Sequence, residues 1–365
     1  MESNALLEEI LSNFKFEGKL HKQKQHHVGN INDTFILTFM DGDKKNKYIV
    51  QRINHHVFTE PKRLMDNMVK VTQHIASKIK EVGGDVSRET LNLIMTNDGK
   101  AFYETESGNY YRAFPFISKA QTYMKVESDV HIYEAGKALG KFQKQLSDFE
   151  PSELFEVIKD FHNTPVRYLA FEKAIEEDVA DRVKLAMNEI KFIMDRRKDL
   201  SKLTELLEEG KLPLRVTHND TKFNNIMIDD ETGKAICVID LDTVMSGLSL
   251  YDFGDAIRSG CSTATEDETN LADVTIDLNL YKKFVEGVME ECEDTLNSYE
   301  VENIPFSAKL ITMELAMRFL TDYLNGDTYF KVNSDTHNLE RTKNQLKLAY
   351  EMEANMDYME ECLAK

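Results

Sequence analysis

The sequence predicts an α+β protein with two lobes: a small antiparallel-sheet lobe over residues 1–114 and a larger, mainly helical lobe over residues 115–365. Up to about residue 114, short β-branched and aromatic runs alternate with turn residues, which is typical of strands. From about residue 118, apolar residues recur instead at helical spacing over long stretches. Pro115 restricts the backbone where the strands end, and this indicates a short link between the lobes.

In the first lobe we expect a sheet of roughly five strands with one helix, after an N-terminal stretch of helical pattern. MESNALLEEILSNF has the pattern of an amphipathic helix. The runs TFILTFM and KYIVQRI flank the turn DGDKKN and predict a two-strand hairpin. In EPKRLMDNMVKVTQHIASKIKEVGG, Pro61 suits a first helical turn and the two glycines end the helix. LNLIMTNDGKAFYETESGNYYRAF then predicts a three-strand meander with turns at NDG and ESGN.

The second lobe is predicted to be helical except for one hairpin. Helical patterns fill residues 131–146, 170–210, 274–296 and 305–324. Between them, the apolar runs 226–229 and 235–239 enclose the turn sequence DDETGK, in which Gly233 can adopt positive φ. These runs predict a hairpin embedded among helices.

Composition and charge limit the classes of partner. Hydrophobic residues make up 41% of the chain and charged residues 30%, which is usual for a globular protein. The formal net charge of −19 argues against a nucleic acid or an anionic membrane as partner, because both bind a basic face. A small neutral or cationic substrate remains compatible with this charge.

Cysteine usage and the N-terminus indicate where the protein works. The four cysteines lie far apart and form no C-x-x-C pair, which argues against a thiolate zinc site and favours a reducing compartment. The first residues lack the basic start and apolar block of a secretory signal. No run of about 18 apolar residues could span a membrane. We therefore expect a cytoplasmic protein.

The predicted hairpin brings polar residues together at one end. If its turn centres between Thr232 and Gly233, Asn225 faces Asp240, with about 5 Å between their Cβ atoms. Asp220 lies five residues before Asn225 on the entering loop, within reach of the same point.

This set of side chains suits phosphoryl transfer. Amide and carboxylate oxygens at an open site are typical of Mg²⁺ bound together with substrate phosphates. A further Asp can accept the proton of an attacking hydroxyl, and phosphoryl transfer needs little else beyond positioning. We expect Asp242 to be ordinary turn polarity, and we decline a metal site at His26 and His27, since neighbours on a strand point apart.

The phrases GNINDTF, QRIN, THNDTK, CVIDLDTV, YDFGDAIR and MRFLTDYLNGDTYF carry a resemblance that spreads over most of the chain. HNDTKFNN followed by VID resembles the catalytic loop and metal-binding strand of protein-kinase-like enzymes. In detail the chain resembles the aminoglycoside phosphotransferase and choline kinase family, most closely its N-acetylhexosamine 1-kinases. The resemblance implies a bilobal protein-kinase-like fold. It also implies ATP- and Mg²⁺-dependent phosphorylation of the anomeric hydroxyl of N-acetylglucosamine or N-acetylgalactosamine.

The resemblance also implies residue roles. Asp220 is the base that orients the sugar hydroxyl, while Asn225 and Asp240 are the metal ligands. His218 braces the catalytic loop and Asp252 anchors it. The expected nucleotide contacts are Gly29, Asn30, Asn32, Asp33 and Thr34 in the loop over the phosphates, Gln51 or Arg52 on the next strand, and Phe116 and Ile117 at the hinge. The expected acceptor contacts are Asp220, Arg318 and Tyr329.

The sequence departs from the family at one position. The family commonly has a phosphate-binding lysine on the third strand, where this chain reads YIVQRIN. Because side chains alternate along a strand, only one of Gln51 and Arg52 can face the nucleotide. The family's partner glutamate is also displaced, since Glu60 precedes Pro61 at the start of the following helix.

Other functions stay open beside the sugar kinase. The acceptor could be an aminoglycoside, choline or another small alcohol within the same family. A non-catalytic nucleotide-binding protein is a reading from a different class, and the absent lysine is its support. A carboxylate-pair hydrolase is disfavoured, because Asn225 has no acid–base role. We expect ATP and a small sugar as partners, with the oligomeric state left open.

Overall fold

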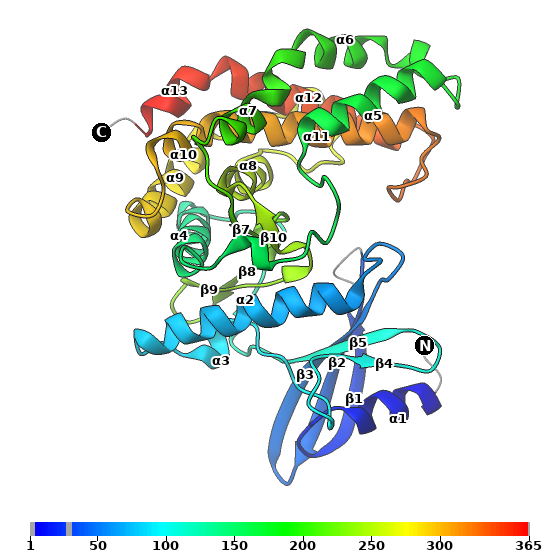
Figure 1. The fold of residues 1–365 in the computed structure, drawn as a ribbon, viewed down its shortest axis with the longest axis vertical. Coiled ribbons are helices and arrows are strands. Elements are labelled where there is room, and N and C mark those ends of the chain that lie inside the picture. The colour runs from blue at the N-terminus through cyan, green and yellow to red at the C-terminus, as the bar shows by residue number, and fades with distance from the viewer. Residues whose placement is uncertain (1–3, 27–30, 364–365) are drawn as a thin grey trace.

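The computed structural model describes residues 4–26 and 31–363, and it confirms the predicted fold class. A small antiparallel-sheet lobe lies at one end, and a larger, mainly helical lobe lies at the other (Figure 1). Helix α2 (Pro61–Glu81) crosses between them. The last strand of the first sheet ends at Pro115, where the chain passes toward the second lobe.

The first lobe holds a five-stranded sheet in the order β1-β2-β3-β5-β4, with all neighbouring strands antiparallel. The predicted hairpin is present and runs without a register shift, from Asp33 opposite Arg52 to Asp41 opposite Lys44. The strands are β1 (Lys19–His26), β2 (Asp33–Asp41), β3 (Lys44–Ile53), β4 (Tyr103–Glu104) and β5 (Tyr110–Pro115).

Two strand predictions for this sheet need correction. The strand β1 was not predicted, because KLHKQKQH is almost entirely polar and lies exposed at the sheet edge. The expected first strand of the meander, LNLIM at residues 91–95, forms no strand. Its backbone instead makes single hydrogen bonds on two sides, from Ile94 N to Ala113 O and from Lys15 N to Met95 O.

Each face of the sheet is covered by a helix. Helix α1 (Asn4–Asn13) packs on the outer face, where Ile10 and Phe14 meet the side chains of β2, β3 and β5. Helix α2 covers the inner face, and its apolar stripe also contacts Leu241 and Val244 of the second lobe. The inner face of the sheet therefore looks toward the junction of the lobes.

The second lobe is built from helices around a large apolar core, with two small sheets at its boundary with the first lobe. One sheet pairs β7 (Arg215–Thr217) with β10 (Met245–Gly247), and the other has the order β6-β8-β9. The strands of the second sheet are β6 (Ala120–Gln121), β8 (Ile226–Asp229) and β9 (Ala235–Val238).

Helices form at the predicted stretches 131–146, 274–296 and 305–324, whereas the predicted stretch 170–210 divides into three helices. The helices at residues 249–260, 298–302, 337–354 and 356–361 were not predicted. Asp178 adopts a left-handed conformation with φ of 37° and ends α5. The helices of this lobe are α4 (Asp129–Gln145), α5 (Thr164–Glu177), α6 (Met187–Asp195), α7 (Lys202–Glu208), α8 (Ser249–Gly260), α9 (Leu278–Cys292), α10 (Ser298–Glu302), α11 (Ile304–Leu324), α12 (His337–Ala354) and α13 (Met356–Glu361), while the short α3 (Val86–Glu89) follows α2 in the first lobe.

Helices α4 and α9 approach closely because glycines face the partner backbone. A Cβ atom on Gly136 would lie 2.2 Å from the carbonyl oxygen of Phe284, and one on Gly287 would lie 2.2 Å from that of Tyr133. No side chain fits at either position without moving the helices apart. Among the described helices, none is long and apolar enough to cross a lipid bilayer.

The register of the β8–β9 hairpin differs from the prediction. Ile226 pairs with Val238, and the amide of Ile239 donates to the carbonyl of Asn225 at 2.9 Å, so Asn225 faces Ile239 rather than Asp240. The cause is Asp229, whose Oδ1 accepts from Glu231 N, Thr232 N and Thr232 Oγ1 at 2.7–3.1 Å. These capping hydrogen bonds move the centre of the turn toward Asp229. An irregularity in the strand pairing after Met227 then brings the register part of the way back to the predicted one.

We expect Asp229→Asn to destabilise the protein in a pH-dependent way. The hydrogen bonds from Thr232, and next the one from Arg88, lower the pKa of Asp229 to about 2. The unfolded value is about 3.9, so the stabilisation is complete above about pH 4 and disappears as the pH falls toward 2. Urea denaturation at pH 7, 5 and 3 should show a difference from wild type that is constant at first and smaller at pH 3. A difference independent of pH would contradict the cap.

Candidate active site

The catalytic loop begins where β7 ends, and a buried carboxylate fixes its backbone. Asp252, at the start of α8, accepts from His218 N at 2.9 Å, from Asn219 N at 2.7 Å and from Gln143 Nε2 at 3.0 Å. Asn219 adopts φ of 66°, and its side chain bonds back to Thr217. Asp252 is 1% exposed, and this burial raises its pKa. Hydrogen bonds to Asp252 therefore connect the loop to helix α8 in the interior of the lobe.

His218 connects this loop to the hairpin. Its Nδ1 accepts from the amide of Asp220 at 3.2 Å, so the ring proton lies on Nε2, which donates to the carbonyl of Ile239 at 2.8 Å. The carbonyl of His218 in turn accepts from Thr243 Oγ1 at 2.6 Å. Because Ile239 precedes Asp240, the histidine sets the distance between the two aspartates.

Asp220, Asn225 and Asp240 come together although the hairpin register differs from the prediction. The side-chain amide of Asn225 donates to the carbonyl of Asp220 at 2.8 Å. Asp240 leaves strand geometry with φ of 64°, immediately after the residue that pairs with Asn225. This left-handed turn lets Asp240 reach the site without facing Asn225 across the ladder.

Asp240 lies in an electronegative position. Its pKa is raised to about 6, first because the surrounding protein replaces water and then because Asp242 and Asp220 carry negative charge. Arg112 and His218 act in the opposite direction. An incoming cation would relieve this repulsion, since it favours the ionised carboxylate.

Asp220 has a cation of its own. Lys222 Nζ lies 3.0 Å from Asp220 Oδ1, and the Asp220 side chain is 29% exposed. Burial acts to raise the pKa of Asp220, but Lys222 outweighs it, so the net shift is downward. The same pairing raises the pKa of Lys222. Asp220 is therefore ionised at neutral pH and can accept a hydrogen bond from a hydroxyl group.

The donor atoms present fit a divalent cation at an open site. Neither carboxylate oxygen of Asp240 nor Oδ1 of Asn225 has a hydrogen bond with any described residue, so these oxygens are free to bind. A cage of three or more His, Cys, Asp or Glu side chains is absent from residues 4–26 and 31–363. Two protein oxygens completed by phosphate and water suit Mg²⁺ better than such a cage.

Several residues predicted to contact nucleotide lie on or next to the inner face of the sheet. Thr34 and Gln51 pair across β2 and β3, and Gln51 Nε2 donates to Thr34 Oγ1 at 3.1 Å. Arg112 on β5 pairs with Gln51 and shares this face. Asn32, just before β2, donates to Asp242 Oδ2 at 2.5 Å. The predicted loop residues Gly29 and Asn30 lie outside the described residues.

The alternation of side chains along β3 decides whether Gln51 or Arg52 takes the place of the family's phosphate-binding lysine. Arg52 lies on the opposite face from Gln51 and forms an ion pair with Asp33. Asp33 and Arg52 are therefore directed away from the junction of the lobes, and the expectation that they contact nucleotide does not fit this geometry. Gln51 takes the inner position.

The hinge residues Phe116 and Ile117 follow β5. The amide of Phe116 donates to the carbonyl of Lys47 at 3.0 Å, and Lys47 Nζ lies 4.9 Å from the Phe116 ring centroid. Ile117 forms no hydrogen bond with a described residue. Of the two hinge amides, that of Ile117 is the one left to bind a ligand.

Arg318 and Tyr329 lie together at the far side of the catalytic loop. The Arg318 guanidinium lies over the rings of Phe161 and Phe330, at 5.1 and 5.7 Å from their centroids. Tyr329 is 63% exposed, and its amide is held by Asp322 Oδ1 at 2.8 Å. Arg318 forms no hydrogen bond or ion pair with any described residue.

A buried chain connects this region to the catalytic loop. Glu314 accepts from Thr164 Oγ1 at 2.6 Å and pairs with His162 Nδ1 at 2.8 Å, while His162 Nε2 lies 3.2 Å from the carbonyl of Asn219. Burial acts to lower the pKa of His162, but Glu314 outweighs it and raises the pKa. The buried pair of His162 and Glu314 therefore lies between Arg318 and the loop that carries Asp220.

Sequence reasoning missed Lys222, His162 and the pair of Arg112 with Asp242. Lys222 had a usable signal, because it follows Asp220 by two residues within the polar loop. His162 and Arg112 had none, because their partners lie 152 and 130 residues away in the chain.

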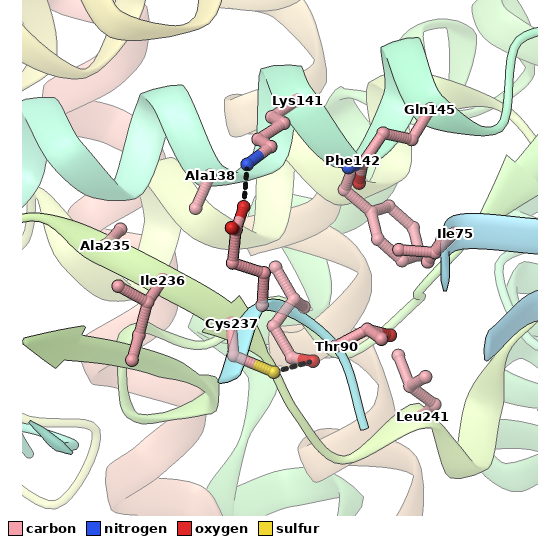
Figure 2. A pocket seen from close by; sticks show the side chains of 12 residues that line it. Ile75, Thr90, Ala138, Lys141, Phe142, Gln145, Ala235, Ile236, Cys237 and Leu241 are labelled. Carbon is pink, nitrogen blue, oxygen red and sulfur yellow. Dashed lines mark hydrogen bonds and ion pairs between the residues drawn. The ribbon is translucent and has the colours of Figure 1, made fainter. Parts of the chain in front are cut away.

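A separate, small pocket lies between α2, α4 and β9 and contains none of the predicted site residues (Figure 2). Lys141 on α4 points into it and pairs with Glu89 at 2.7 Å. Cys237 also lines it, but burial raises the pKa of this thiol to about 12. The charged groups satisfy one another and the thiol is not ionised, so we assign no chemistry to this pocket.

Comparison with known proteins shows the family of the chain. A family model described as the phosphotransferase enzyme family matches residues 22–278. This span includes the catalytic loop, the hairpin and Asp252, but it ends before Arg318 and Tyr329.

Solved structures share the fold over nearly the whole chain. A microcompartment-associated aminopropanol kinase is 14% identical, with a TM-score of 0.58, covering 97% of this chain and 98% of that one. A spectinomycin phosphotransferase in complex with ADP and spectinomycin is 15% identical, with a TM-score of 0.58 and coverage of 97% and 99%. A choline kinase from Cryptosporidium parvum Iowa II is 14% identical, with a TM-score of 0.59 and coverage of 98% and 97%.

We expect Asp252→Asn to lower the free energy of unfolding by about 2–3 kcal/mol, since it leaves at least one buried donor unsatisfied. Asp277→Asn is the matched control, because Asp277 also accepts two backbone amides, at 2.9 and 3.0 Å, but caps a helix at which Asn serves equally well. Urea denaturation of both variants measures the difference. Equal stability of the two variants would contradict the anchoring role of Asp252.

Proposed function

Because the chain belongs to the phosphotransferase enzyme family, we propose that it is an ATP- and Mg²⁺-dependent kinase that phosphorylates the anomeric hydroxyl of an N-acetylhexosamine. The observation that carries the phosphotransferase chemistry is the meeting of Asp220, Asn225 and Asp240 at the junction of the lobes. The choice of acceptor rests on the arginine-lined region beyond the catalytic loop and on the resemblance described above.

Asp220 orients the attacking hydroxyl. Its pKa is lowered through Lys222, so the carboxylate is ionised and accepts a hydrogen bond from the acceptor oxygen. As the acceptor oxygen bonds to the γ-phosphorus of ATP, the bond from that phosphorus to the β–γ bridging oxygen breaks and ADP leaves, while the proton of the acceptor hydroxyl passes to Asp220. Lys222 lies 3.0 Å from the carboxylate and is placed to exchange this partner for a phosphoryl oxygen as charge moves.

Asn225 and Asp240 are the residues that would hold Mg²⁺ through their free oxygens. The ion would neutralise phosphate charge of the nucleotide. Thr34 and Gln51 approach the phosphates from the sheet above, and the free amide of Ile117 binds the adenine edge. The similar spectinomycin phosphotransferase was solved in complex with ADP, which supports a nucleotide as a ligand of this fold.

The acceptor region favours a neutral sugar over a cation. The charge of Arg318 acts to lower the pKa of both His162 and Arg167. The pKa of Arg167 is lowered, with burial as the largest cause and the charge of Arg318 as the second. Two guanidinium groups near one another repel an ammonium group. They can instead donate to the carbonyl oxygen of an acetamido group and to ring hydroxyls, while the exposed Tyr329 ring can stack on the sugar.

A second acceptor class is supported by other observations. The solved neighbours include kinases named for aminopropanol and choline and a phosphotransferase for spectinomycin, all of which carry nitrogen. The net charge of −19 would also attract a cation. In this alternative the same Asp220 acts on the hydroxyl of an amino alcohol or an aminoglycoside.

We expect N-acetylglucosamine or N-acetylgalactosamine to give faster ADP release than choline, aminopropanol or spectinomycin in a coupled assay. Phosphorus NMR of the product should show the phosphate on the anomeric carbon. Asp220→Asn should lower kcat by roughly 10²–10⁴-fold, because the proton acceptor is lost. Faster turnover of an amino alcohol would transfer the proposal to the second class. Nucleotide binding without turnover of any acceptor would favour a non-catalytic binding protein.

We expect Arg318→Gln to raise the KM for the sugar by about 10-fold or more, because one charged hydrogen bond is worth about 1.5–3 kcal/mol. The KM for ATP should not change, since Arg318 lies on the acceptor side. Arg197→Gln is the matched control, because the Arg197 side chain is 64% exposed and lies on a peripheral turn. An equal rise in both KM values would show a general disturbance rather than an acceptor contact.

A further inference from the structure

A buried guanidinium lies where the sheet, α2 and the segment after Asp240 meet. Arg112 is 1% exposed. Its Nε and Nη2 donate to Gln51 Oε1 at 3.0 and 2.8 Å, and its Nη1 forms an ion pair with Asp242. From α2, the sulfur of Met68 lies 3.9 Å from Nη1 of Arg112. Among the described residues, the one anion paired with Arg112 therefore comes from the other lobe.

Asp242 joins this cation to the loop over the phosphates. The carboxylate is 4% exposed, and its second oxygen accepts from Asn32 Nδ2 at 2.5 Å. Asn32 Oδ1 in turn accepts from the amide of Asn54 at 3.0 Å. Arg112, Asp242 and Asn32 thus form one continuous link, which we call the lobe bridge, from the sheet to the metal-binding segment and back.

The lobe bridge bears on the geometry of Asp240. Asp240 has φ of 64° and begins the short turn Leu241–Thr243, which contains Asp242. Fixing the side chain of Asp242 therefore fixes the turn that directs Asp240. Without Arg112, the negative charge of Asp242 would stand uncompensated beside Asp240 and Asp220.

Stability alone does not account for such a pair. Burying two charges costs solvation free energy, and a well-packed apolar pair of the same volume is often at least as stable. An ion pair between fixed atoms does, however, specify one relative position of the two segments that it joins. Asp242 is buried and both of its carboxylate oxygens are bonded, as expected of a residue that fixes the relative position of two segments.

We propose that Arg112 is a positioning residue: through the lobe bridge it holds Asp242 and Asn32, so that the turn that carries Asp240 keeps a fixed position against the sheet for binding a metal–nucleotide complex. This inference rests on the proposed function in one respect, namely that Asp240 is a metal ligand. It assigns no direct contact between Arg112 and phosphate.

The test compares ADP affinity with and without Mg²⁺ by isothermal titration calorimetry, which needs no acceptor and no turnover. We expect wild type to bind ADP at least 10-fold more tightly with Mg²⁺. Arg112→Gln should lose most of that gain while its affinity for ADP alone stays within about twofold, and Arg112→Lys should recover part of it. Arg196→Gln is the matched control, because it breaks an Arg–Glu353 pair between α6 and α12, far from the cleft.

The double variant Arg112→Gln with Asp242→Asn keeps the test valid if the single variant fails to fold, since it leaves no buried charge unpaired. It should fold and still lack the gain from Mg²⁺. A double variant with the full wild-type gain would overturn the proposal, as would a wild type without any gain. An equal loss of ADP affinity with and without Mg²⁺ in Arg112→Gln would show direct phosphate contact and would also overturn it.

The same data separate this inference from the proposed function. If wild type phosphorylates no sugar or amino alcohol, but Arg112→Gln lacks the gain in ADP affinity that Mg²⁺ gives to wild type, the proposed function fails and the positioning role stands. If wild type turns over a sugar and Arg112→Gln keeps the gain, the positioning role fails and the proposed function stands.

Discussion

The site depends on one constraint, the hydrogen bonding that joins the catalytic loop to the β8–β9 hairpin. His218 donates to the carbonyl of Ile239, and the amide of Ile239 donates to the carbonyl of Asn225. These bonds connect segments that contribute the base and the two metal ligands of the proposed mechanism. Asp252 holds the loop from beneath, so the loop cannot shift without leaving buried amides unsatisfied. Every later step, from metal binding to orientation of the hydroxyl, requires these two segments in register.

The second requirement is the management of charge. Asp242 and Asp220 lie close enough to Asp240 to add to the effect of burial and raise the pKa of Asp240. The protein divides them among partners: Lys222 pairs with Asp220, Arg112 pairs with Asp242, and Asp240 is left free. The one carboxylate without a protein partner is thus the one in the best position to bind a cation. This division explains why a buried arginine is retained where apolar packing would be no less stable.

The sequence was sufficient for the parts of the site that are local in the chain. The polar loop around Asp220 and the hairpin after it were readable from spacing and turn residues, whereas the helix that carries Asp252 was not predicted. The register was not, because the side chain of Asp229 closes the turn in a way that turn propensity alone does not show. Arg112 was not readable either, because its role depends on Asp242, 130 residues away. Strand β1 was hidden by its polar composition, and edge strands exposed on both faces carry no alternation to detect.

The most direct test of the central claim is the binding of Mn²⁺, in place of Mg²⁺, to the protein with ADP, followed by the electron paramagnetic resonance signal of free Mn²⁺. The account predicts that wild type with ADP removes more Mn²⁺ from solution than ADP or protein alone. It predicts that Asn225→Ala reduces this effect severalfold without changing the folded structure. Equal Mn²⁺ binding by wild type and Asn225→Ala would contradict the claim that the catalytic loop and the hairpin hold the metal jointly.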